Sequence, residues 1–134
     1  MNVSILRQGD FLIASIHTAL DDSELVQFQS DVVAQVGAVR ARGVIIDVAA
    51  LDVLDSFGSH ALRNLAHMAR LRGAATVIVG IAPEVAFSIV ELGMDLDIET
   101  ALDLEQGLAL LELITAGSRS NGSGVEVVRD RRPS

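Results

Sequence analysis

Short apolar runs alternate with longer amphipathic segments along most of the chain. Apolar runs bounded by turn residues predict strands, and apolar positions repeated every three or four residues predict helices. Residues 3–18 are typical of two short strands joined by a turn at Gln8, Gly9 and Asp10. Beyond them we expect strands at residues 44–51, 74–82 and 96–100, and helices at residues 20–43, 57–73, 83–93 and 103–117.

This order of elements predicts an α/β fold. Strands that alternate with helices pair in parallel through right-handed crossovers, and the opening hairpin adds an antiparallel edge. The expected architecture is a four- to five-stranded mixed sheet with about four helices packed on it. We expect one domain at residues 1–116, followed by a flexible Gly/Ser/Arg-rich C-terminal tail at residues 117–134.

Polar residues at the ends of the amphipathic segments predict where several helices begin and end. Asp21 and Glu24 have the spacing of a capping box, and Gly43 is suited to ending the same helix. Thr100 and Asp103 offer a second pair of capping residues before the last helix.

Composition and charge narrow the possible functions. The chain has 134 residues, 50% hydrophobic, with no cysteine or lysine and a net charge of -8. It therefore lacks a disulfide framework, a thiol nucleophile, a phosphate-loop lysine and a Schiff-base lysine. Sixteen acids and six arginines precede Gly117, and such an acidic body argues against nucleic-acid binding. With neither a signal-peptide pattern nor an apolar run long enough for a membrane, we expect a cytoplasmic protein.

The main candidate for chemistry is the start of the second expected helix, in the segment VLDSFGSHALRNLAHMARLRG, residues 53–73. Asp55 and Ser56 stand just before its first turn, where unpaired amides and the helix dipole favour negative charge. One of them could act only as an N-cap, or Ser56 could accept a phosphoryl group, which a helix start receives well. His60, Arg63 and His67 fall on the side of the helix away from its apolar face.

Catalytic and metal-binding interpretations of this segment are weaker. His60 follows Ser59 directly, and neighbouring side chains on a helix point about 100° apart, so they do not form a nucleophile–base pair. His60 and His67 have no carboxylate one turn away to complete a metal site. Asp47 ends a strand as a receiver-domain aspartate does, but the chain has no lysine to accompany it. We expect neither an enzyme nor a metal or cofactor site.

The stretch VIIDVAALDVLDSFGSHAL, residues 44–62, resembles the strand, turn and helix of STAS domains. The resemblance extends over roughly residues 3–116 on the predicted order of elements, and it implies the STAS (SpoIIAA-like) fold. It also implies that Ser56, preceded by Asp55, is the phosphoacceptor; Ser59 is a second choice. Phe57 in the D-S-F-G sequence, with LDDSELVQFQSDVV and ELGMDLDIETALDLEQGLALL, is similar to the RsbS-type scaffolds of the stressosome.

The resemblance implies a set of protein partners. An RsbS-type scaffold forms homo-oligomers and hetero-oligomers, the latter with RsbR-type co-scaffolds. It sequesters an RsbT-type serine kinase until its own serine is phosphorylated. An RsbX-type phosphatase then removes the phosphate. The residues expected to bind partners surround the start of the helix: Asp55, Phe57, Ser59, His60, Arg63 and His67.

Two other functions remain open at this point. A free-standing anti-sigma-factor antagonist would bind its kinase one-to-one and form no large particle. A small-ligand or nucleotide-binding domain is disfavoured because the chain has no glycine-rich phosphate loop.

Overall fold

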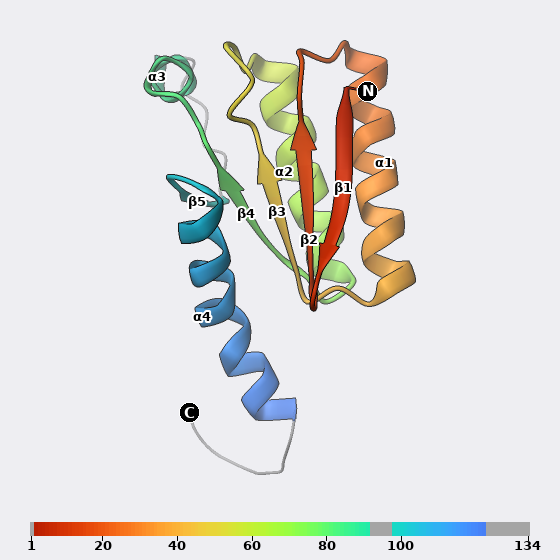
Figure 1. Cartoon of the computed structure of the whole chain (residues 1–134). Coiled ribbons are helices and arrows are strands. Elements are labelled where there is room, and N and C mark those ends of the chain that lie inside the picture. The colour runs from red at the N-terminus through yellow and green to blue at the C-terminus, as the bar shows by residue number, and fades with distance from the viewer. Residues whose placement is uncertain (1, 92–97, 123–134) are drawn as a thin grey trace.

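The computed structural model describes residues 2–91 and 98–122 and confirms the expected mixed α/β architecture. Its strands and helices appear in chain order in Figure 1. The strands are β1 (Val3–Gln8), β2 (Phe11–Ile16), β3 (Gly43–Asp47), β4 (Ala75–Val79) and β5 (Glu99–Ala101). The helices are α1 (Asp22–Val39), α2 (Ser56–Leu71), α3 (Pro83–Glu91) and α4 (Leu104–Gly122).

The five strands form one sheet in the order β1-β2-β3-β4-β5. β1 and β2 pair antiparallel, and every other neighbouring pair is parallel. The carboxyl ends of β2, β3 and β4 therefore meet at one edge of the sheet, which we call the carboxyl edge. Their amino ends meet at the opposite edge, the amino edge, which also carries the β1–β2 turn. α1 and α2 both run from the carboxyl edge to the amino edge, as Figure 1 shows.

The sheet buries apolar side chains on both faces because successive residues of a strand point to opposite sides. Leu12, Ala14 and Ile16 of β2 belong to the core cluster shared with α1 and α2. Phe11 and Ile13 of the same strand belong to a second cluster, shared with α4. This two-sided burial explains why the strands appear in the sequence as nearly continuous apolar runs.

The predicted capping box of α1 is present. The Asp21 carboxylate accepts the Glu24 amide at 2.8 Å, and the Glu24 carboxylate accepts the Asp21 amide at 3.0 Å. The hydrogen bond from the Glu24 backbone is the main reason why the pKa of Asp21 lies below its usual value. The Asp103 carboxylate likewise accepts the Gln106 amide at 2.9 Å, whereas Thr100 lies within β5.

The prediction that Gly43 ends the first helix was wrong. α1 ends at Val39, and Arg40 forms the left-handed C-cap with a φ of 54°, donating its amide to the Val36 carbonyl. Gly43 instead opens β3, where a Cβ would lie 2.9 Å from a methyl group of Leu111. Its role is thus close packing beneath α4.

Some boundaries also differ from the expected ones. β3 stops at Asp47, whereas a strand had been expected to continue to residue 51. α4 continues to Gly122, past the expected domain boundary at residue 116, so the division into a domain and a flexible tail stays a prediction. Part of the expected strand at 96–100, the expected helix end at Gly93 and residues 123–134 lie outside the described residues.

Candidate functional site

The connection between β3 and α2 lies at the carboxyl edge and is held in place by short-range hydrogen bonds. The Asp47 carboxylate accepts the Ala49 amide at 2.9 Å, and the Leu51 amide donates to the Val48 carbonyl at 2.9 Å. The Val48 amide donates to the Val79 carbonyl at 3.1 Å, which ties the connection to β4. The connection therefore presents α2 from a fixed position.

Gly80, directly after β4, allows the next connection to pass close to this one. Its φ is +82°, a left-handed conformation that side chains with a Cβ rarely adopt. A Cβ at Gly80 would lie 2.8 Å from the Ala49 Cβ and 3.0 Å from the Ala49 amide nitrogen. The glycine thus sets how closely the two connections of the carboxyl edge approach.

The first turn of α2 is capped by Asp55. Its backbone is extended, and its carboxylate accepts the Gly58 amide at 2.8 Å, while its carbonyl accepts the Ser59 amide at 2.9 Å. Gly58 has no Cβ to disturb this arrangement; a Cβ there would lie 2.9 Å from Leu54 and 3.3 Å from the Asp55 carboxylate. The D-S-F-G sequence therefore supplies both the cap and the space for it.

Ser56 is the first residue of α2 and is exposed. Because Asp55 provides the capping carboxylate, Ser56 is not the N-cap of this helix. Its hydroxyl lies where amide groups and the positive end of the helix dipole would favour an attached anion. Of the two interpretations of the Asp-Ser pair, the geometry assigns the cap to Asp55 and leaves Ser56 accessible.

Ser59 does not lie on the surface, contrary to its expected place among the partner-binding residues and as a second phosphoacceptor. Its side chain is only 1% exposed, and within the described part of the chain its hydroxyl has no hydrogen-bond partner. The reason is its position on α2, three residues before Leu62 and seven before Ala66, which are both buried. A kinase could reach this hydroxyl only after the helix had moved.

The other expected residues form an exposed surface along α2. Ser56, His60, Arg63 and His67 recur at helical spacing along one face, which we call the α2 stripe. Ser56, His60 and His67 are exposed, and Arg63 is half-buried. Phe57 lies beside the stripe with 39% of its surface exposed. The stripe therefore brings a hydroxyl that could be phosphorylated onto the same face as three basic side chains.

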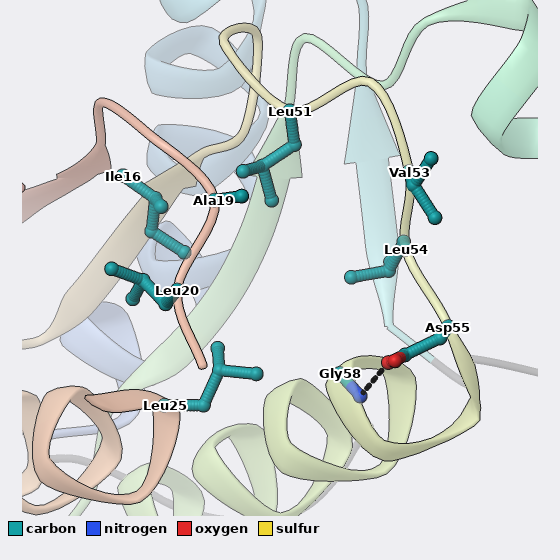
Figure 2. Close-up of a pocket in the computed structure, with 9 residues that line it drawn as sticks. All are labelled: Ile16, Ala19, Leu20, Leu25, Leu51, Val53, Leu54, Asp55 and Gly58. Carbon is teal, nitrogen blue, oxygen red and sulfur yellow. Dashed lines mark hydrogen bonds between the residues drawn. The ribbon is translucent and has the colours of Figure 1, made fainter. Parts of the chain in front are cut away.

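A small apolar pocket, which the sequence did not predict, opens next to the start of α2. It has a volume of about 170 Å³, and Figure 2 shows side chains from the β2–α1 connection facing those from the β3–α2 connection. Its lining residues are Ile16, Ala19, Leu20, Leu25, Leu51, Val53, Leu54, Asp55 and Gly58. Apolar residues placed between acids in both connections were the available signal, but only the fold shows that the two connections meet.

Within residues 2–91 and 98–122, no three His, Cys, Asp or Glu side chains gather as metal ligands would. None of the helices described there has the length and apolar character needed to cross a membrane.

Comparison with known families gives a match over most of the chain. The model of the STAS domain family matches residues 2–107. Two RsbT co-antagonist proteins of Bacillus subtilis (strain 168) are similar in sequence. RsbRA is 36% identical over 70 residues, which are 52% of this chain and 26% of RsbRA. RsbRD is 28% identical over 79 residues, which are 58% of this chain and 28% of RsbRD. The aligned part thus spans only about a quarter of each relative.

Solved structures agree with this match. A serine-to-glutamate variant of Moorella thermoacetica RsbS is 33% identical, with a TM-score of 0.75 over 87% of this chain and 99% of that chain. A chain from a structure of the stressosome, described as a signal integration and transduction hub, is 31% identical. Its TM-score is 0.68 over 84% of this chain and 98% of that one. A putative anti-sigma factor antagonist from Thermotoga maritima shares the fold at 12% identity, with a TM-score of 0.70 over 82% of this chain and 94% of that one.

Proposed function

Because this chain belongs to the STAS domain family, as a member of its stressosome type, we propose that it is a phosphorylation-switched scaffold of a stressosome. In its unphosphorylated form it holds an RsbT-type serine kinase. Phosphorylation of Ser56 by that kinase releases the kinase, and an RsbX-type phosphatase resets the scaffold. The protein acts by binding and does not itself catalyse a reaction.

The observation that carries this proposal is the exposed Ser56 at the first position of a helix already capped by Asp55. A phosphoryl group adds a charge of about -1.5 to -2 and three acceptor oxygens. At Ser56 it would meet the amide end of α2 without removing the Asp55 cap or changing a buried contact. The fold would tolerate the modification, so its main effect would fall on a partner resting against α2.

The α2 stripe gives the modification a way to change partner affinity. Before phosphorylation, the Arg63 guanidinium and the ring N–H donors of His60 and His67 favour a partner surface that carries acidic groups. A phosphoryl dianion on Ser56 would lie one helical turn from His60 and two from Arg63, so it would counter their attraction. It would also repel acidic groups of the partner and add a desolvation cost at the contact.

The similar proteins support the assembly part of the proposal. RsbRA and RsbRD are named as co-antagonists of RsbT, and two similar structures are of RsbS and of the stressosome. We therefore infer that this chain assembles with RsbR-type STAS proteins into a large particle. The mass of the complex formed with an RsbR-type protein tests this: a discrete heterodimer would favour a free-standing anti-sigma-factor antagonist instead.

The test of the switch is to treat the purified protein with its cognate RsbT-type kinase and ATP and to map the phosphate by peptide mass spectrometry. We expect a single phosphate on Ser56 and loss of kinase from the phosphorylated protein in a pull-down. A phosphate on another residue would overturn the assignment to Ser56. Equal retention of the kinase by the phosphorylated and unphosphorylated proteins would overturn the switch itself.

A further inference from the structure

The two edges of the sheet carry opposite charge. Five of the six arginines that precede Gly117 lie at the amino edge, in or beside the turns that join its elements: Arg7, Arg40, Arg42, Arg70 and Arg72. The carboxyl edge has acidic residues and neither lysine nor arginine in its connections, residues 17–21 and 48–55. Acids near helix starts and arginines near helix ends stabilise α1 and α2 through their dipoles. They also separate charge across the molecule, negative at the carboxyl edge and positive at the amino edge.

The apolar pocket lies at the carboxyl edge, among its acidic residues. Its volume of about 170 Å³ is close to the roughly 150 Å³ of an engineered protein cavity that holds one benzene molecule. It is smaller than the roughly 300 Å³ or more of usual small-molecule sites. Asp55 is its one polar side chain, and that carboxylate already accepts the Gly58 amide. The pocket therefore suits one large apolar side chain.

The residues around the pocket indicate which charge should flank an apolar side chain that enters it. Asp21 and Asp22 stand between the lining residues Leu20 and Leu25, and Asp52 stands between two others. All three acids are exposed. An apolar side chain flanked by cationic groups would satisfy both the pocket and its rim.

The amino edge presents such a side chain. Leu71, the last residue of α2, is 87% exposed and stands between Arg70 and Arg72, which are both exposed. The Arg72 guanidinium donates to the Val33 carbonyl at 3.2 Å, so the residue next to Leu71 is held against α1. The leucine thus projects from a fixed base at the edge opposite the pocket.

We propose that Leu71 of one copy enters the carboxyl-edge pocket of a second copy, with Arg70 and Arg72 facing the acidic rim. In this arrangement the end of α2 in one copy faces the start of α2 in the next. The negative end of one helix dipole therefore lies against the positive end of the other. Each copy keeps one unused leucine or one unused pocket, and the contact continues into a ring or an open chain. Formation of this head-to-tail contact requires neither the kinase nor a phosphate on Ser56.

The test is self-association of the full chain in sedimentation velocity over a range of concentrations at low salt. We expect the mean mass of the wild type to rise with concentration.

Leu71→Asp removes the projecting side chain, and Ala19→Leu fills the pocket from an exposed loop position. Each is expected to weaken association roughly tenfold to a hundredfold, as loss of one buried leucine implies. Leu113→Asp, at a 75% exposed position on α4, is the matched control and should associate as the wild type does.

Mixing the two variants gives the decisive measurement. The Leu71→Asp copy keeps its pocket, and the Ala19→Leu copy keeps its leucine, so together they should form a one-to-one dimer that grows no further. A mixture that stays monomeric, or single variants that associate like the wild type, would overturn the proposal. Val53→Arg at the rim, which would repel Arg70 and Arg72 of the other copy, replaces Ala19→Leu if circular dichroism shows that Ala19→Leu is unfolded. Loss of kinase binding by a pocket variant whose self-association is unchanged would assign the pocket to the kinase and overturn the proposal too.

Discussion

At the scale of single residues, Ser56 is the position where a small change should alter binding but leave folding intact. Ser56→Ala should retain the kinase and fail to release it in the presence of ATP. Ser56→Asp adds one charge where a phosphate adds nearly two, so we expect a partial effect, about fivefold weaker binding or ~1 kcal/mol. Titration calorimetry with the kinase measures this. Ser30→Asp, on the exposed face of α1, is the matched control, and equal weakening by both variants would contradict a specific role for Ser56.

Asp21 gives a pH dependence whose sign follows from its cap. Its pKa is lowered in the folded protein, from a usual value of 3.8, mainly by the hydrogen bond from the Glu24 amide. The unfolded chain therefore takes up the proton first as the pH falls. The resulting stabilisation is present above about pH 3.8 and is lost as the pH falls through the lower pKa of the folded state.

Asp21→Asn tests this dependence because asparagine is also a good N-cap but does not titrate. We expect the difference in unfolding free energy between wild type and variant to shrink as the pH falls from 5 to 2, roughly the range in which paired carboxylates protonate. Urea unfolding at several pH values measures it. Asp31→Asn removes a carboxylate from the same helix away from the cap, and a matching pH trend there would contradict the assignment to Asp21.

At the scale of elements, a comparison of two glycines distinguishes the cost of backbone strain from the cost of steric crowding at the carboxyl edge. Gly73 and Gly80 have similar φ values, +91° and +82°, but a Cβ would meet open space at Gly73 and the Ala49 backbone at Gly80. Gly73→Ala should cost about 1–2 kcal/mol, the usual penalty of the left-handed region. Gly80→Ala should cost measurably more in urea unfolding, since it also displaces the connection that leads to α2. Equal costs would mean that the close approach to Ala49 contributes nothing.

Most of the elements could be predicted from periodicity, because the burial of an apolar face dominates where a segment is long. The end of α1 could not, since an arginine took the left-handed cap that glycine usually fills. The exposed positions of His60 and His67 followed from helical spacing alone. The buried Ser59 could have been found in the same way, from its spacing to Leu62 and Ala66. The pocket could not, because it joins two connections about thirty residues apart in the chain.

At the scale of the whole molecule, the separation of arginines and acids makes association depend on salt. Exposed charges more than a Debye length apart are screened, and that length falls from about 10 Å at 0.1 M to about 3 Å at 1 M salt. The proposed contact combines exposed arginines and acids, whose attraction salt screens, with one buried leucine, whose apolar burial salt does not weaken. Raising sodium chloride from about 0.05 M to 0.5 M should therefore reduce self-association and leave a residual part that Leu71→Asp removes.

The charged part of the contact can be isolated at Arg70, which is exposed in the last turn of α2. Arg70→Gln keeps a polar side chain with the same first two methylene groups but removes the positive charge. We plot the logarithm of the association constant against the logarithm of the salt concentration and expect a shallower slope for this variant than for the wild type. At high salt the two proteins should associate with the same affinity. Arg63→Gln, in the middle of α2, keeps the wild-type slope because it lies away from both edges. If the two variants have the same slope, the contact does not involve the arginines of the amino edge.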